Sequence, residues 1–292
     1  MFTSENTSVS FIGTGVMGKS MAGHLLSAGF RVTVYTRTKE KAESLLEKGA
    51  EWAETPADAA QKANVIFTMV GYPNDVEEVY FGEQGLFDNA KEGTYFIDMT
   101  TSTPTLAKKL YDEAKSRGMH SIDAPVSGGD IGAREARLAV MAGGDEEDFK
   151  AVLPLLEKLG TNIVYQGKAG SGQHTKMCNQ IAIASNMLGV SEAIVYAEKA
   201  GLDPETVLKS ISTGAAGSWS LTNLAPRMIN GDFEPGFYIK HFIKDMKIAL
   251  EEAEKMGMDA PGLSLSKSLY EQLAQKGEEN SGTQAIYKYW QK

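Results

Sequence analysis

Residues 9–18 read VSFIGTGVMG, four residues typical of a strand followed by a glycine-rich turn. In such a turn the first glycine permits a tight bend, the second lets the backbone approach a pyrophosphate, and the third lets helix and strand pack closely. The helix that follows offers free N–H groups and a partial positive charge to phosphates. A tight turn without a ligand is the alternative. The stretch therefore predicts a dinucleotide site made by Gly13, Thr14, Gly15, Val16, Met17 and Gly18.

The end of the second apolar run distinguishes the two nicotinamide dinucleotides. Many NAD-binding folds have an acidic residue there, which bonds the ribose 2′-hydroxyl. Here the run is followed by Thr36, Arg37 and Thr38, and Arg37 can pair with a 2′-phosphate instead. We therefore expect NADP as the cofactor, with NAD as the alternative. A solvated surface arginine is the interpretation that gives Arg37 no cofactor role.

Short apolar runs alternate with helical segments through the first half of the chain. The runs cover residues 9–12, 32–35, 65–70, 95–97 and 138–141. Strands that alternate with helices predict βαβ units, so we expect an α/β fold with a doubly wound, mostly parallel sheet of the Rossmann type. We expect Thr103-Pro104 to begin a helix. Four glycines are expected to end helices: Gly29, Gly49, Gly118 and Gly160.

The strand pattern stops near Gly170, and an unbroken helical pattern of 27 residues covers 174–200. Such a helix would be about 40 Å long, and its largely apolar circumference predicts burial between domains or subunits. Further helices are expected from Asp203-Pro204 onward. We therefore predict a dinucleotide-binding domain at 1–168 and an all-helical domain at 169–292, which begins with the long interdomain helix.

Composition excludes several classes of protein. The 292 residues carry a net charge of -9, which argues against a nucleic-acid partner. The one cysteine, Cys178, excludes an internal disulfide, and we expect it to be buried as a small apolar group. The four histidines have no metal-ligand spacing, so we expect no metal. The polar residues 1–7 and the lack of a long apolar stretch predict no signal peptide, no membrane span and a cytoplasmic location.

Two further runs carry candidate chemistry. Residues 123–129 read DAPVSGG, and two glycines after a serine expose consecutive N–H groups that suit a carboxylate; a flexible loop is the alternative. In 170–180, GSGQHTKMCNQ, we expect Lys176 in the first turn of the long helix, with Asn179 and Gln180 on the same face. A cation is unfavourable at a helix N-terminus. Lys176, desolvated and with a pKa lowered from roughly 10.4, is thus a candidate general acid or base.

The glycine-rich turn, the DAPVSGG run, the run from Gly172 to Lys176 and the long helix together resemble the 3-hydroxyacid dehydrogenase family. The resemblance covers nearly the whole chain. That family includes 3-hydroxyisobutyrate dehydrogenases and tartronate semialdehyde reductases and is related to 6-phosphogluconate dehydrogenase. Residues 69–73 and 214–220 look like those of a bacterial branch of uncharacterised dehydrogenases. One departure is Ala136-Arg137-Leu138, where the family usually has Gly-Thr-Leu or Gly-Asn-Leu.

The resemblance implies hydride transfer between nicotinamide and a small 3-hydroxy acid or its semialdehyde, in a homodimer or homotetramer. Lys176 would be the general acid/base, with Ser127 and Asn179 as the other catalytic residues. The substrate would be held by Ser127, Gly128, Gly129, Asn179, Gln180, Lys244 and Asp245. Further cofactor contacts would come from Met69, Val70, Thr101 and Lys244. Which of the two adjacent amides orients the substrate is left open.

Two other functions remain open from the sequence. A decarboxylating dehydrogenase of the 6-phosphogluconate type would release CO2, although that class has a much longer helical C-terminal region. A non-catalytic dinucleotide-binding protein would bind cofactor tightly without turnover, although Lys176, Asn179 and Ser127 argue against it.

Overall fold

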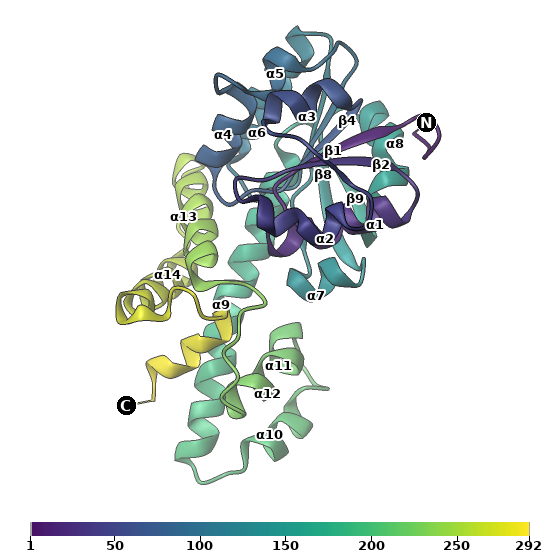
Figure 1. Cartoon of the computed structure of the whole chain (residues 1–292). Helices are drawn as coiled ribbons and strands as arrows, with labels where there is room; N and C mark the ends of the chain where they lie inside the picture. The colour runs from purple at the N-terminus through teal and green to yellow at the C-terminus, as the bar shows by residue number, and fades with distance from the viewer. Residues whose placement is uncertain (1, 292) are drawn as a thin grey trace. The chain divides into compact units, whose positions relative to one another are not determined.

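The computed structural model describes residues 2–291, and the chain divides into two compact units after Lys176. Met1 and Lys292, which end the two predicted domains, lie outside the described residues. Figure 1 shows the strands of the first unit enclosed by helices and the helices of the second unit. No helix within residues 2–291 is long and apolar enough to cross a membrane.

The first unit is built on one sheet whose order is β3-β2-β1-β4-β5-β6-β8-β7, with β9 paired to β8. The first six strands in this order are parallel, β8 runs antiparallel to β6 and β7, and β9 is parallel to β8. The order reverses between β1 and β4, which is where doubly wound sheets bind ligands. The strands are β1 Ser8–Ile12, β2 Arg31–Tyr35, β3 Glu51–Trp52, β4 Val65–Thr68, β5 Tyr95–Asp98, β6 His120–Asp123, β7 Val126–Ser127, β8 Leu138–Gly143 and β9 Gly160–Gly167.

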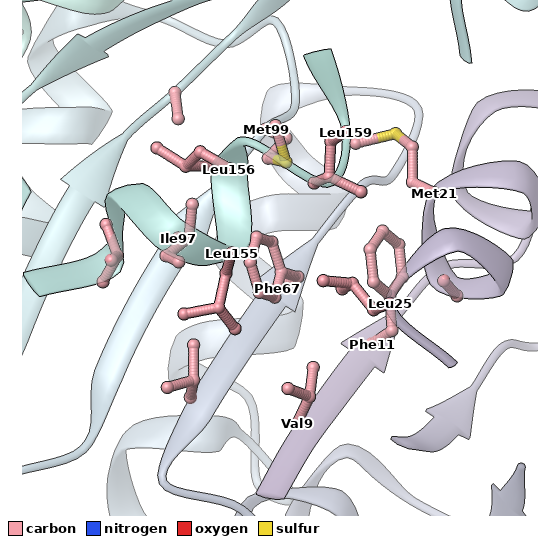
Figure 2. Packing of buried hydrophobic residues seen from close by; sticks show 14 of the residues in the cluster. Val9, Phe11, Met21, Leu25, Phe67, Ile97, Met99, Leu155, Leu156 and Leu159 are labelled. Carbon is pink, nitrogen blue, oxygen red and sulfur yellow. The ribbon is translucent and has the colours of Figure 1, made fainter. Parts of the chain in front are cut away.

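Helices cover both faces of this sheet, because side chains along each strand alternate between two cores. Phe11 packs with Phe67 and with residues of α1 and α8 on one face (Figure 2), whereas Ile12 faces α3, α4 and α6 on the other. Figure 2 shows Met21 and Leu25 directed at that first core. The helices are α1 Val16–Ser27, η1 Lys39–Ala42, α2 Glu43–Leu46, α3 Pro56–Lys62, α4 Pro73–Phe81, α5 Leu86–Asn89, α6 Pro104–Ser116, α7 Gly129–Arg134 and α8 Glu146–Leu156.

The second unit is helical and has its own core, in which Phe242, Met246 and Tyr270 are fully buried. The long helix α9 begins in the first unit and continues through the second. Asp203 caps α10, since its carboxylate accepts a hydrogen bond from the Thr206 N–H. The helices are α9 Ser171–Lys199, α10 Pro204–Ile211, α11 Trp219–Asn223, α12 Ala225–Ile229, α13 Ile239–Lys255, α14 Pro261–Leu273, η2 Ala274–Glu278 and η3 Thr283–Tyr289.

The predicted α/β fold with a helical second half is confirmed, and so are most of its expected local signals. Thr103 caps α6 by accepting from the Leu106 N–H, and Gly29, Gly49 and Gly118 have the positive φ of helix-ending glycines. Gly160 does not end a helix. It begins β9, where a Cβ would overlap the carbonyl oxygen of Leu138 on β8.

Three other expectations were wrong in detail. The sequence pattern missed β3, β6 as a complete strand, β7 and β9, because these are short or polar and form through pairing with neighbouring strands. The long helix begins at Ser171, three residues earlier than expected, so Lys176 is its sixth residue and lies in the second turn. Cys178 is exposed instead of buried.

Candidate active site

The glycine-rich turn joins β1 to α1 at the reversal point of the sheet. Gly13 has φ +96°, and a Cβ there would overlap the carbonyl oxygen of Met69. At Gly18 a Cβ would overlap the carbonyl oxygen of Gly13, so both positions require glycine for close packing. At Gly15, by contrast, a Cβ would have no atom within 4 Å. The turn is therefore tightly packed on its protein side and open beside its central glycine.

This turn fits a dinucleotide. The hydroxyl of Thr14 is buried and has no hydrogen-bond partner among residues 2–291, which leaves a polar atom for a ligand to satisfy. Val16, at the first position of α1, is exposed although it is apolar, and Met17 is half-buried. A pyrophosphate at this helix N-terminus would meet free N–H groups beside the open space at Gly15.

The ends of β4 and β5 form the opposite side of the reversal point. The Met69 N–H donates to the Ile12 carbonyl at 2.8 Å, which continues the pairing of β4 with β1 by one residue. The Val70 N–H donates to the Thr100 hydroxyl at 3.0 Å, and Thr101 follows directly. Met69, Val70 and Thr101 are each half-buried, so all three retain exposed surface at this edge.

Arg37 lies just beyond the end of β2, with its side chain 79% exposed. Its guanidinium is 3.1 Å from a carboxylate oxygen of Asp75, a partner that the sequence analysis did not identify. The other Asp75 oxygen accepts from the Tyr72 N–H at 3.0 Å, which fixes this carboxylate at the start of α4. Arg37 thus meets a fixed acid but retains solvent-facing donors; Thr36 is half-buried and Thr38 exposed beside it.

The predicted carboxylate loop lies between β7 and α7. Gly128 and Gly129 have φ values of +131° and +61°, a conformation that L side chains rarely adopt. Ser127 and Gly129 are half-buried and Gly128 is exposed. Successive backbone N–H groups in glycine turns can form anion-binding concavities, so this conformation is compatible with the predicted carboxylate site.

Lys176 is 6% exposed and projects from the second turn of α9. Lys176 therefore lies beyond the first turn, so the expectation of a cation placed unfavourably at the helix N-terminus was wrong. Burial of a lysine remains costly unless it is paired. Asn179 and Gln180 follow three and four positions later, which places them next to Lys176 along the helix.

Four predicted site residues form one connected network within the second unit. The Asn179 amide donates to the Gln180 carbonyl oxygen at 2.7 Å, and the Gln180 amide donates to an Asp245 oxygen at 2.6 Å. The ammonium of Lys244 lies 3.0 Å from the other Asp245 oxygen. Gln180 and Asp245 are both buried, whereas Asn179 is half-buried. Both ends of the Gln180 amide are thus engaged by protein groups.

Gln173, which holds α9 on the sheet, was not predicted from the sequence. Gln173 is fully buried, and its backbone N–H donates to Asp123, the first residue of the DAPVSGG run. No pattern in the sequence distinguishes Gln173 from a surface helix residue. Residues 2–291 contain no group of three His, Cys, Asp or Glu side chains that could hold a metal ion.

Family models match both halves of the chain. Residues 8–167 match the NAD-binding domain of 6-phosphogluconate dehydrogenase, and residues 170–290 match the corresponding NAD-binding model of NADP-dependent 3-hydroxyisobutyrate dehydrogenase. The chain is 67% identical over 284 residues to the uncharacterized oxidoreductase YkwC of Bacillus subtilis, with 97% of this chain and 99% of that protein covered. It is 40% identical over 267 residues to 2-hydroxy-3-oxopropionate reductase of Escherichia coli, with 91% of each covered.

Solved structures agree with these matches. A 3-hydroxyisobutyrate dehydrogenase of Mycobacterium tuberculosis, described with L-serine, has a TM-score of 0.89 at 31% identity, covering 97% of this chain and 98% of that one. Psf3, described in complex with NADP+ and 2-OPP, has a TM-score of 0.89 at 26% identity, covering 96% and 99%. The chain therefore belongs to the 3-hydroxyisobutyrate dehydrogenase family of NAD(P)-dependent hydroxyacid dehydrogenases.

Proposed function

We propose that this enzyme interconverts a small 3-hydroxy acid and its semialdehyde, with Lys176 as the general acid/base. The observation that carries the proposal is a buried lysine one helical turn before Asn179, in a chain whose first unit has the packed and open sides of a dinucleotide turn. In oxidation Lys176 would take the hydroxyl proton, and in reduction it would return a proton to the carbonyl oxygen. A bound nicotinamide would supply or accept the hydride.

The loop at Ser127, Gly128 and Gly129 would hold the substrate carboxylate. Its support is the positive φ of the two adjacent glycines, a turn whose backbone N–H groups could bind an anion without requiring a cationic surface. This suits a chain of net charge -9, in which an anionic substrate needs a local site. Holding the carboxylate would fix the orientation of the reacting carbon.

We further propose that Asn179 is the amide that contacts substrate and that Gln180 acts through it. Both ends of the Gln180 amide already have protein partners, whereas Asn179 is the more exposed of the two. Lys244 and Asp245 would extend the same network, with Lys244 reaching the cofactor side. The charges of Lys244 and Asp245 are paired, and this pairing offsets the desolvation cost of burying either side chain, since an unpaired buried charge is strongly destabilising.

We propose that NADP is the physiological cofactor and that the reductive direction prevails. Cofactor contacts would come from residues 13–18, Thr36, Arg37, Thr38, Met69, Val70 and Thr101. The support is Arg37 in place of the usual acid after β2, together with the NADP in the description of the matching family model and of one solved relative.

The names of the relatives narrow the class of substrate. One is a reductase of 2-hydroxy-3-oxopropionate, which is a semialdehyde, and another structure is described with L-serine, which is a 3-hydroxy acid. We propose substrates of this size and chemistry for the present chain. We also propose that the two domains divide at 168/169, near the limits of the two family models, and that the enzyme is cytoplasmic.

A homodimer or homotetramer is a further proposal. Its support is the apolar surface that the single chain leaves exposed in its second unit: Tyr196, Leu202, Met256, Met258 and Leu265. Light scattering after size-exclusion chromatography should give a multiple of 31.5 kDa. A mass of one chain at micromolar concentration would contradict this proposal.

The function is tested by following absorbance of reduced nicotinamide with purified protein, both cofactors, and a panel of small semialdehydes and 3-hydroxy acids. Turnover with NADPH in preference to NADH is the expected result. Release of CO2 in step with cofactor reduction would instead favour a decarboxylating dehydrogenase. Tight NADPH binding without turnover across the panel would favour the non-catalytic alternative.

A further inference from the structure

Asp123, at the end of β6, is a buried carboxylate that the proposed reaction does not use. One of its oxygens accepts from the Gly170 N–H at 2.7 Å, and the other accepts from the Gln173 N–H at 2.8 Å. These donors flank the first turn of α9, whose N–H groups have no partners within the helix. The carboxylate also carries the charge that a helix N-terminus favours. Asp123 therefore caps α9 from a strand 47 residues earlier in the chain.

Gln173 provides a second attachment between α9 and the sheet. Its side-chain oxygen accepts from the Ser102 N–H at 2.9 Å, and its amide donates to the Thr100 carbonyl at 2.8 Å. The Thr100 hydroxyl in turn accepts from the Val70 N–H. The carboxyl ends of β4, β5 and β6 are thus connected to the first turn of α9 by hydrogen bonds.

Two glycines allow this close approach. At Gly172 a Cβ would overlap the Met141 carbonyl oxygen and lie 2.8 Å from an Asp123 oxygen. At Gly143 a Cβ would lie 2.6 Å from the other Asp123 oxygen and 2.7 Å from the Gly172 nitrogen. Neither position has room for a side chain, so the helix end and the two strands are packed at backbone contact around the carboxylate.

We propose that Asp123 is a positioning residue that fixes the start of α9 on the sheet and thereby sets the place of Lys176, three residues beyond Gln173. The proposal rests on Lys176 as the group that transfers the proton. Thr101 lies between Thr100 and Ser102, the two residues that Gln173 binds. The hydrogen bonds made by Asp123 and Gln173, together called the clamp, therefore connect the proposed nicotinamide contact at Thr101 to the proposed acid/base. Asp123 itself touches neither substrate nor cofactor in this account.

The cost of the carboxylate supports a positioning role. Burial raises the pKa of Asp123 from 3.8 to about 7, although its backbone N–H donors act in the opposite direction. A buried charge carries a large desolvation penalty, and well-packed apolar groups often hold two elements together at least as stably. The carboxylate fixes the orientation of the helix end, because its two oxygens bind two backbone N–H groups at once.

Asp123→Asn tests the clamp, because the amide keeps the shape but can accept from only one of the two N–H groups. Asp148→Asn is the matched control: Asp148 is also buried and lies in the same unit, but it is on α8 and contacts His120 at the start of β6, not the first turn of α9. At pH 8 we expect amide hydrogen exchange of residues 170–176 to become roughly tenfold faster in the first variant and to stay unchanged in the control. The kcat should fall by roughly 100-fold, since misplacement of about 1 Å has effects of this size.

The readout that a merely structural role would not produce is a split between kcat and cofactor affinity. NADPH affinity of Asp123→Asn, measured by fluorescence titration, should stay within about twofold of the wild-type value. Gln173→Leu, which keeps the helix but removes the second attachment, should show the same split if Asp123→Asn does not fold. Wild-type exchange and wild-type kcat in Asp123→Asn, or parallel losses of kcat and NADPH affinity, would overturn the clamp. A fully active Lys176→Ala would instead overturn the proposed function and leave the exchange result standing.

Discussion

At the residue scale, we propose that cofactor choice depends on Arg37 and on Asp75, the acid that it contacts. The carboxylate of Asp75, fixed by the Tyr72 N–H, offers Arg37 a partner that a 2′-phosphate would have to share or replace. Because Arg37 is largely exposed, this pair contributes little to stability, and its effect falls on binding. If Arg37 pairs with the 2′-phosphate as proposed, Asp75 is a second residue that would bear on selectivity for NADP.

Replacing Arg37 with Ala should weaken NADPH binding by roughly tenfold, or about 1.4 kcal/mol, and leave NADH binding unchanged. The reason is that only NADPH carries the phosphate that Arg37 would pair with. Arg31→Ala provides the control, since Arg31 is an exposed arginine at the opposite end of β2. Fluorescence titration with both cofactors measures the effect. Equal loss for both cofactors would contradict the role given to Arg37.

At the element scale, different glycines of the turn between β1 and α1 are expected to serve folding and cofactor binding. Gly15 has φ -69°, which Ala also adopts, and a Cβ there would meet open space. Gly15→Ala should therefore leave the melting temperature unchanged and weaken NADPH binding at least tenfold, because the methyl group would occupy space left for the pyrophosphate. Gly18→Ala should destabilise the fold, since its Cβ would overlap the Gly13 carbonyl. If Gly15→Ala bound NADPH normally, the cofactor could not approach this turn as described.

The turn before β8 has a strained residue where the sequence departs from its family. Ala136 has φ +51° and is the one residue other than glycine within 2–291 that has a positive φ. The left-handed conformation is costly for a residue with a Cβ. Ala136→Gly should therefore raise the free energy of unfolding by about 0.5–1 kcal/mol. Ala133→Gly, in α7, should lower it by a similar amount, and denaturant unfolding compares the two variants. A loss of stability in both would contradict the strain.

Local patterns predicted the elements whose signals lie within a few residues. β1 and the turn after it could be predicted because four apolar residues and three glycines stand together. β6 includes His120 and Ser121 and has no apolar run, so it becomes a strand only through pairing with β5. The start of α9 was missed because Ser171-Gly172 is typical of a loop, whereas Asp123 caps the helix from a distant strand.

The candidate site also contains residues that local patterns predict and residues that only distant contacts bring into place. Lys176, Asn179 and the Ser127 loop stand in recognisable motifs, so the sequence could name them. Gln173 and Asp75 carry no motif, and only the folded chain brings them to Asp123 and Arg37. Short-range patterns therefore predicted the residues with proposed chemical roles, while packing was needed to find the residues that position them.

At the scale of the whole molecule, Asp123 should make stability depend on pH. Burial raises its pKa to about 7 in the folded chain, and the neighbouring Asp98 raises it further, whereas the unfolded value is near 3.8. The folded chain therefore keeps this proton to higher pH than the unfolded chain does. As a result, the contribution of Asp123 to the free energy of unfolding falls as pH rises from about 4 to about 7 and does not change above pH 7.

Asp123→Asn cannot lose this proton, so its stability relative to wild type should rise across that pH window, by at most about 1.4 kcal/mol per pH unit. Denaturant unfolding of both proteins from pH 4.5 to pH 8 measures the difference, in which the other carboxylates cancel. A difference that does not change with pH would mean that Asp123 titrates normally.

In the proposed mechanism a buried lysine on α9 transfers the proton while a separate glycine turn binds the cofactor. Both parts are tested together by cofactor oxidation with wild type and with Lys176→Met, a neutral side chain of similar length, with NADPH affinity measured in parallel. We expect turnover to fall by roughly 100- to 10,000-fold and NADPH affinity to stay within about twofold of wild type. Turnover near the wild-type rate in Lys176→Met would show that this lysine does not transfer the proton.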